Sequence, residues 1–257
     1  MILGIDVGNT HITFGCIKEG IVLKPLYRIP TDRKETEYGY AIRFKEILGL
    51  NGIEADSLDG AVISSVVPVV TGLLEKAVKL IADVEVLTVG PGIKTGIKIA
   101  IDDPGTLGAD LVTTAVAAAE KYPLPCIIID MGTATTVTVL GENKDFRGGA
   151  IYPGLGTSLN ALTQGTSLLP AIEVNVPKHA VATNTVDCIK SGIVYGTAGA
   201  IDGIISALEK EMGPAKSIVC TGGMGPLVSP YCTHDLIDDE ELLLDGLEII
   251  WEKNKSK

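Results

Sequence analysis

Two short segments of the sequence each place an aspartate at the end of an apolar run, followed by one residue, a glycine and polar side chains. They are "DVGNT" (Asp6 to Thr10) and "DMGTATT" (Asp130 to Thr136). Such a turn can aim backbone N–H groups at phosphate oxygens, and the carboxylate can bind cations directly or through water. One copy alone is more simply a hairpin, but two matching copies favour a nucleotide clamp. In that clamp the phosphate-holding side chains are Asn9, Thr10, Thr133, Thr135 and Thr136.

The runs around these motifs predict the elements that must hold them in place. Alternating and β-branched runs predict strands, and helical spacing predicts helices. The first half has expected strands at 2–6, 11–17, 22–28 and 61–66, with helices at 37–50 and 70–82. The second half has expected strands at 125–130, 135–140, 147–153 and 217–220, with helices at 158–162, 186–210 and 240–253. The shared plan predicts two lobes, 1–117 and 118–257, with a cleft between them.

The composition narrows the classes of partner. The chain has 257 residues, is 46% hydrophobic and 4% aromatic, and carries a formal net charge of -11. This charge argues against a nucleic-acid partner, because phosphate backbones are held by clustered Lys and Arg. The five cysteines show no C-x-x-C pair and are expected to be reduced thiols. No signal peptide or membrane-length apolar stretch is evident, so we expect a cytoplasmic protein with no membrane partner.

A third candidate acid lies between the two motifs. Asp103 and Pro104 predict a helix start, with aspartate as N-cap and proline at the first helical position. Asp110 would then fall about two turns into the helix, on one face with the threonines Thr106, Thr113 and Thr114. From the residues alone, a polar stripe facing water is the simpler interpretation.

The phosphate motifs resemble those of the actin-like kinase superfamily, whose third element, a Gly-Gly turn after a late strand, is matched by "SIVCTGGMG" (Ser217 to Gly225). Within it, nearly the whole chain resembles the type III pantothenate kinases. The residues that carry this likeness are "DVGNT", "DPGTLGAD", "DMGTATT", "GGAIYPGL" and "NTVDCIKSGI". The resemblance implies an α/β fold of duplicated ribonuclease-H-like lobes, as in actin-like ATPases, each a mixed sheet flanked by helices, with an interlobe cleft.

The same resemblance implies a function and a set of site residues. The activity would be ATP-dependent phosphorylation of the primary hydroxyl of pantothenate, the first step of coenzyme A biosynthesis, by a homodimer that uses Mg²⁺ and a monovalent cation, K⁺ or NH₄⁺. Asp110 would be the general base, and Asp130 and Asp6 would bind cations. The expected nucleotide-binding residues are Asp6, Val7, Gly8, Asn9, Thr10, His11, Ile12, Thr13, Thr133, Gly222 and Gly223. The expected pantothenate-binding residues are Ile101, Leu107, Gly108, Ala109 and Thr185.

Two positions depart from the family pattern on the acceptor side. Leu111 stands where the family has an arginine after Gly-Ala-Asp, and Ile101 stands at a position that is usually aromatic. Three alternatives to a pantothenate kinase therefore stay open: a kinase of another small hydroxyl compound, a nucleotide-binding regulatory homologue without catalysis, and a phosphohydrolase. A P-loop enzyme is excluded, because no G-x-x-x-x-G-K-[ST] occurs.

Overall fold

The computed structural model describes residues 1–255, and the chain divides into two compact units. The first comprises Met1–Gly96, Asp103–Ala117 and Glu241–Lys257, and the second comprises Ile97–Asp102 and Ala118–Glu240. This division differs from the expected 1–117 and 118–257 at two segments. The last helix packs on strands of the first unit, and β7 (Lys98–Ile99) pairs with β10 of the second.

The first unit is built on a mixed sheet with strand order β3-β2-β1-β5-β6, and β4 also pairs with β2. Its central strand β1 is antiparallel to β2 and parallel to β5. The strands are β1 (Ile2–Val7), β2 (His11–Lys18), β3 (Ile21–Val22), β4 (Tyr27–Pro30), β5 (Gly60–Ser65) and β6 (Glu85–Thr88). The strands expected at 2–6, 11–17 and 61–66 are confirmed. The run expected at 22–28 is divided between β3 and β4, and the short, polar β6 was not predicted.

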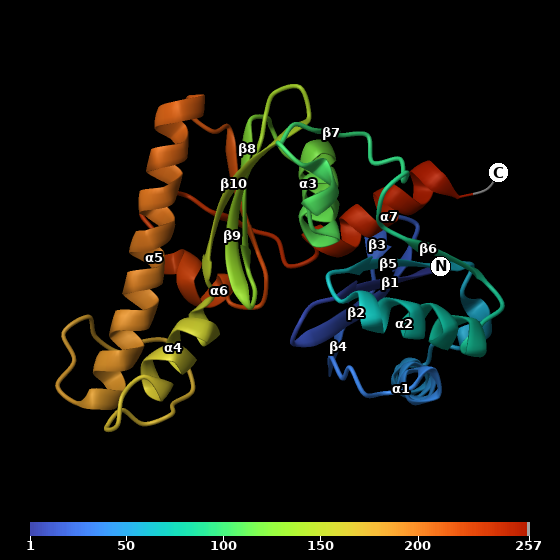
Figure 1. Cartoon of the computed structure of the whole chain (residues 1–257), viewed down its shortest axis with the longest axis horizontal. Coiled ribbons are helices and arrows are strands. Elements are labelled where there is room, and N and C mark those ends of the chain that lie inside the picture. The colour runs from blue at the N-terminus through green and yellow to red at the C-terminus, as the bar shows by residue number, and fades with distance from the viewer. Residues whose placement is uncertain (256–257) are drawn as a thin grey trace. The chain divides into compact units, whose positions relative to one another are not determined.

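Helices cover both faces of this sheet. α1 (Glu37–Leu50) and α2 (Pro68–Ile81) lie on one face (Figure 1), where apolar side chains of alternate strand positions form the core. α7 (Leu242–Asn254) packs on β1, β2 and β5 from the other face. Its Trp251 lies where a Cβ on Gly60 would be, so Trp251 is a core residue that requires a glycine opposite it.

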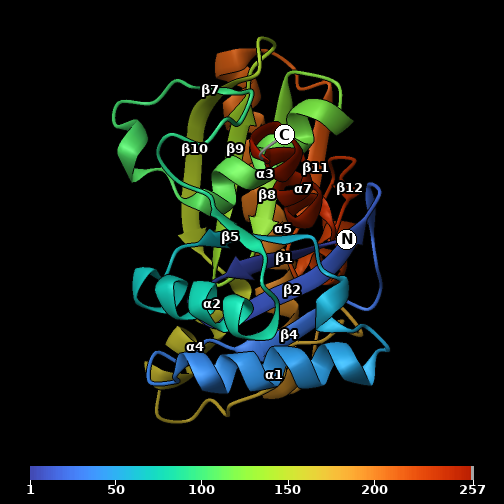
Figure 2. The ribbon, with the colours of Figure 1, turned by 90° about the vertical axis from the view of Figure 1, so that its right-hand side faces the viewer.

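The second unit is built on another mixed sheet, with order β12-β11-β8-β9-β10-β7. Its further strands are β8 (Cys126–Met131), β9 (Ala134–Leu140), β10 (Asp145–Pro153), β11 (Ser217–Thr221) and β12 (Ile237–Asp238). β8 is antiparallel to β9 and parallel to β11, which repeats the relation of β1 to β2 and β5. Both sheets thus place an antiparallel partner on one side of the aspartate strand and a parallel partner on the other. Figure 2 shows the ribbon from a second direction.

The helices of the second unit are α4 (Leu155–Gln164), the long α5 (Thr185–Met212) and the short α6 (Gly225–Val228). Ala198, Ile201 and Ile205 of α5 are buried in a core with the apolar side chains of β8 and β9. By length and composition α5 is also able to cross a membrane, which the sequence-based expectation did not foresee. The part of its apolar surface that is buried packs against the sheet, through Ala198, Ile201 and Ile205. All five cysteines are free, as expected.

Candidate active site

The first aspartate motif forms a tight connection between β1 and β2. The N–H of Gly8 donates to the carbonyl oxygen of His11 over 3.0 Å, which closes the turn. Thr31, directly after β4, holds the turn from outside: its hydroxyl donates to the Gly8 carbonyl over 2.7 Å, and its N–H donates to the Thr10 carbonyl over 3.0 Å. The backbone of this loop, residues 8–11, is therefore fixed by hydrogen bonds before any ligand arrives.

Two arginines contact the same loop through their guanidinium groups. Arg33 donates to the Asn9 side-chain oxygen over 3.1 Å, and Arg28 lies 2.9 Å from Nδ1 of His11. Because arginine only donates hydrogen bonds, the contact with Asn9 leaves the amide NH₂ of that side chain to face an anion. The contact with His11 makes Nδ1 the acceptor, and burial together with the Arg28 charge lowers the pKa of the His11 imidazole.

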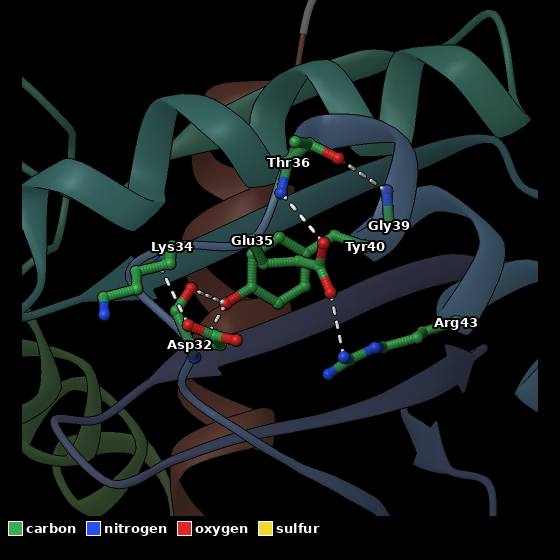
Figure 3. Close-up of polar contacts among 7 residues, drawn as sticks. All are labelled: Asp32, Lys34, Glu35, Thr36, Gly39, Tyr40 and Arg43. Atoms are coloured by element: carbon green, nitrogen blue, oxygen red, sulfur yellow. Dashed lines mark hydrogen bonds and ion pairs between the residues drawn. The ribbon is translucent and has the colours of Figure 1, made fainter.

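The segment that carries these contacts is itself anchored to α1 (Figure 3). The hydroxyl of Tyr40, which is buried, accepts from the Asp32 N–H over 3.0 Å and donates to the Asp32 carbonyl over 2.8 Å. Thr36 caps α1 by accepting from the Gly39 N–H over 3.2 Å, and Glu35 pairs with Arg43 over 2.8 Å. The helix therefore holds residues 31–36 against loop 8–11.

Asp6 lies in a row of polar side chains that crosses three strands. In register, Asp6 is paired with Thr13 on β2 and with Ser64 on β5. Paired residues point to the same face of a sheet. This is the face that α7 covers, because the alternate residues Ile5 and Ile63 point into the core under α1 and α2. The row therefore presents one carboxylate and two hydroxyls at the end of β1.

Asp110 lies in the first turn of α3 (Ala109–Lys121), not two turns into a helix. Asp103 does cap a helix start, by accepting from the Gly105 N–H, but only a 3₁₀ turn, Pro104–Thr106, follows it. Gly105 and Gly108 are poor helix formers, so α3 begins after them. The water-facing stripe is also wrong, because Thr113 and Thr114 are buried.

The surroundings of Asp110 suit a proton acceptor. Burial raises the pKa of its carboxyl above the usual range, and a 2.8 Å hydrogen bond from the Leu111 N–H offsets part of that effect. A Cβ on Gly108 would overlap the Asp110 carboxylate and contact Val66, and Val66 donates to the carbonyl of Val7 over 3.1 Å. Asp110 therefore lies near Val66, which is hydrogen-bonded to the end of β1 beside Asp6.

The second aspartate motif closes in the same way, with the Gly132 N–H donating to the Ala134 carbonyl over 3.0 Å. Here α4 supports the loop: the N–H of Gly154 and the hydroxyl of Thr157 both donate to the carbonyl of Thr133, over 3.1 and 2.7 Å. A Cβ on Gly154 would overlap the carbonyl oxygens of Gly132 and Thr133. Apart from the Thr157 hydroxyl, the loop therefore packs backbone against backbone at Gly154.

The Gly-Gly turn meets this second motif. A Cβ on Gly222 would lie 2.6 Å from a carboxylate oxygen of Asp130, and Gly222 also has a positive φ of 89°. Asp130 is in register with Thr136 on β9 and Thr221 on β11. The structure thus brings the Gly-Gly turn to Asp130 and the hydroxyl-rich loop that follows it, although Gly222 is far from that motif in the sequence.

Two expected acceptor residues belong to the second unit. Ile101 lies 3.6 Å from the position of a Cβ on Gly148, and Thr185 is the first residue of α5, directly after the N-cap Asn184. Leu107, Gly108 and Ala109 lie in the first unit with Asp110. Their common role in binding an acceptor stays a prediction.

Sequence reasoning missed several residues that contact the loops. Each of them is 20 or more residues away in the sequence from the loop residue that it contacts or pairs with. They are Thr31, Arg33, Ser64 and Thr157. No local pattern marks them, because their positions depend on how strands and helices meet. Gly154 was within a quoted motif, but the helix was expected only from 158, whereas α4 begins at Leu155, directly after Gly154.

Comparison with known proteins identifies the family. A sequence model of type III pantothenate kinase matches residues 2–207. The type III pantothenate kinase of Geotalea daltonii is 41% identical over 255 residues, 99% of each chain. That of Halalkalibacterium halodurans is 39% identical over 254 residues, 99% of this chain and 100% of the relative. The chain belongs to the type III pantothenate kinase family. It is therefore a kinase that uses ATP and has an alcohol group as acceptor.

A solved structure extends the likeness in fold. The activator of the 2-hydroxyisocaproyl-CoA dehydratase from Clostridium difficile, with bound ADPNP, has a TM-score of 0.54 and 15% identity, and the match covers 100% of this chain and 99% of that one. This likeness concerns the fold alone. Together with the two mixed sheets, it confirms the α/β, actin-like class that the repeated motif predicted.

Proposed function

We propose that this chain transfers the terminal phosphoryl group of ATP to the primary hydroxyl of pantothenate, the first step of coenzyme A biosynthesis. Besides family membership, the observation that carries the proposal is the position of Asp110. Its half-buried carboxylate has a raised pKa and lies beside Gly108 and near Val66, which is hydrogen-bonded to the end of the Asp6 strand. A kinase needs a base for the acceptor hydroxyl beside the group that serves the phosphates.

On the acceptor side, Asp110 takes the proton from the pantothenate hydroxyl. A carboxylate with a raised pKa is a better base than an ordinary one, because basicity rises with pKa as long as the group stays ionised at neutral pH. Gly108 leaves room beside that carboxylate, since any side chain there would fill it. The further residues proposed to bind pantothenate are Leu107, Ala109, Ile101 and Thr185.

On the nucleotide side, loop residues 8–11 bind phosphate oxygens through backbone N–H groups, Asn9 and Thr10. Mg²⁺ prefers oxygen ligands and keeps several waters. The row of Asp6, Thr13 and Ser64 fits that preference, because it presents a carboxylate and two hydroxyls, of which Ser64 Oγ is buried without a partner among the described residues. Asp6 would hold the ion, which neutralises phosphate charge when it is bound. Val7, Ile12 and Thr13 complete the strand ends at this site.

In the second unit, Asp130 is proposed to bind the monovalent cation, K⁺ or NH₄⁺. The fit rests on oxygen donors again: Thr136 and Thr221 flank Asp130 in register, and Thr136 Oγ1 is buried without a partner among the described residues. Across residues 1–255, no group of three or more His, Cys, Asp or Glu side chains forms a metal cluster. Thr133 would bind ATP, and Gly222 and Gly223 would contact its adenosine.

Leu111 favours one alternative within the same reaction class. It is half-buried at the start of α3, directly after the proposed base, and it supplies no charge for an acidic acceptor. An uncharged hydroxyl compound would lose nothing by this replacement. A kinase of another small alcohol is therefore the second candidate function.

We also propose that the enzyme is a cytoplasmic homodimer. The support is a set of exposed apolar and aromatic side chains on α5 and in the segment before it. Tyr195 and Val186 lie on α5, and Leu168, Val176 and Val181 precede it. Burial of such side chains against a second copy of the chain would remove their apolar surface from water. Light scattering of the purified chain measures the oligomeric state.

The test of the proposed function is ADP release with and without pantothenate, in potassium and then in sodium. Release that depends on both pantothenate and potassium supports the proposal. Release that another alcohol stimulates and pantothenate does not supports the second candidate. Acceptor-independent phosphate release would indicate a phosphohydrolase, and nucleotide binding without turnover would indicate a regulatory homologue.

A further inference from the structure

Ser64 on β5 carries a buried hydroxyl that no described residue satisfies. The residue has 0% of its surface exposed, and its Oγ has no hydrogen-bond partner among the described residues. Burying a hydroxyl without a partner is unfavourable. An apolar residue of similar size would avoid that cost, so the hydroxyl calls for a role in the ligand-bound protein.

The position of Ser64 indicates which ligand it meets. Ser64 is in parallel register with Asp6, and both side chains point to the sheet face opposite the core under α1 and α2. Two residues further along the same face comes Val66, which contacts the Gly108 position beside Asp110. Ser64 therefore lies in the row that leads from the proposed metal carboxylate to the proposed base.

The neighbouring serine shows what a structural hydroxyl looks like on this strand. Ser65 Oγ accepts from the Val67 N–H over 3.1 Å and from the Thr71 hydroxyl over 2.7 Å. Those two hydrogen bonds tie the end of β5 to the start of α2. Adjacent serines thus differ: the hydroxyl of Ser65 is satisfied within the fold, and that of Ser64 is not.

Within the part of the chain that the structure describes, the second unit also has an unsatisfied hydroxyl beside its loop aspartate, on the antiparallel neighbour β9 and not on the parallel neighbour that corresponds to β5. Thr136 pairs in register with Asp130, and its Oγ1 is also buried without a partner among the described residues. An unsatisfied hydroxyl beside the loop aspartate therefore occurs in both sheets. The two hydroxyls lie on opposite sides of their aspartate strands, but each is next to a loop aspartate, which favours a function tied to the aspartates over a local packing defect.

We propose that Ser64 is a positioning residue of the nucleotide site, whose hydroxyl hydrogen-bonds to a water in the hydration shell of the Mg²⁺ that accompanies ATP at Asp6. Mg²⁺ keeps several of its waters when proteins bind it, and outer-shell hydrogen bonds of this kind orient the ion. The inference rests on the proposed metal site at Asp6. It adds that the unsatisfied hydroxyl lowers the stability of the ligand-free protein and strengthens binding of the metal ion in the nucleotide complex.

The experiment compares Ser64→Ala with Ser65→Ala in two measurements. The first is the melting temperature of the ligand-free protein, and the second is Mn²⁺ binding to the protein–ADP complex by electron paramagnetic resonance. Ser64→Ala should raise the melting temperature by roughly 2–4 °C, because it removes an unsatisfied buried group. It should weaken Mn²⁺ binding about 10-fold. Ser65→Ala should lower the melting temperature and leave Mn²⁺ binding unchanged.

A second variant, Ser64→Cys, keeps the shape of the side chain with a slightly larger atom and has only a weak hydrogen-bonding group, so it should weaken Mn²⁺ binding as Ser64→Ala does. Unchanged Mn²⁺ affinity in both Ser64 variants overturns the inference. An unchanged or lowered melting temperature in Ser64→Ala also overturns it, since the hydroxyl would then be satisfied without the ligand. Asp6→Asn separates the two proposals: if it binds Mn²⁺ normally, the proposed metal site is wrong, and if it alone loses Mn²⁺, only the role of Ser64 fails.

Discussion

The two aspartate loops share a strand plan but differ in what surrounds them. Loop 8–11 of the first unit is contacted by side chains, the guanidinium groups of Arg28 and Arg33 and the hydroxyl of Thr31. The second loop, around Gly132 and Thr133, receives an uncharged side-chain contact, from the hydroxyl of Thr157, and is packed by backbone and by Gly154, which has no room for a Cβ.

Because of this difference, we expect the two loops to contribute differently to catalysis and to stability. Charged or titratable side chains can contribute to catalysis. They stabilise the negative charge that develops during phosphoryl transfer, or they accept the proton of the acceptor hydroxyl. Backbone packed without spare volume fixes a shape, and interiors of this kind tolerate little added volume. We therefore expect substitutions around the first loop to change kinetics, and substitutions around the second to change stability.

The largest kinetic effect is expected at Asp110. Asp110→Asn should lower kcat by about 10² to 10⁴, because general-base help is lost, while ATP affinity stays within about 3-fold of the wild-type value. Burial raises the pKa of Asp110, so the ionised form opposes folding at any pH above that pKa, and the variant should not be less stable at pH 7. Steady-state kinetics and thermal unfolding measure both. Unchanged turnover would contradict the assignment of Asp110 as base.

The second largest kinetic effect is expected at Leu111, which stands where the family has an arginine. A charge-assisted contact with an acidic acceptor is worth about 1.5–3 kcal/mol, or roughly 10- to 150-fold in kcat/KM. Leu111→Arg should therefore raise kcat/KM for pantothenate by up to that factor. Leu111→Gln is the control without charge and should give no gain. A stably folded Leu111→Arg protein with reduced activity would show that other groups anchor the acceptor.

The sequence predicted the aspartate motifs and their strands because both depend on local pattern. α1 has the bounds that helical spacing predicted, 37–50, since its own apolar period and the Thr36 cap define it. Asp110 was misplaced within its helix because an N-cap and a proline start a 3₁₀ turn as readily as an α-helix, and Gly105 and Gly108 decide between them here.

Site residues whose positions depend on long-range packing could not be predicted from the sequence. Ser64 is 58 positions from Asp6, its partner in register, and only the β1–β5 pairing brings the two together. Arg33 reaches Asn9 because Tyr40 anchors the intervening segment. Such contacts follow from the assembled fold and not from any local motif.

At the second loop we expect a substitution to change the stability of the protein more than its kinetics. Gly154→Ala should lower the free energy of unfolding by about 1–3 kcal/mol, because the new Cβ overlaps two backbone carbonyls. Gly8→Ala is the matched change in the first loop, where the Cβ would lie 3.2 Å from one carbonyl oxygen, and it should cost less. Urea unfolding of both variants measures the difference. Equal costs would contradict the contrast between a side-chain loop and a backbone loop.

The smallest effect is expected at Arg33. Its guanidinium is exposed, so the hydrogen bond to Asn9 is worth only about 0.5–1.5 kcal/mol. Arg33→Gln should therefore raise KM for ATP roughly 2- to 10-fold, since Asn9 loses the donor that turns its amide NH₂ toward phosphate, while unfolding stays unchanged. Lys34→Gln removes a neighbouring cation whose hydrogen bond, to Asp32, comes from the backbone N–H (Figure 3), so it controls for net charge. An equal rise in KM in both variants would mean that Arg33 acts through general charge, and its contact with Asn9 would then not distinguish the first loop from the second.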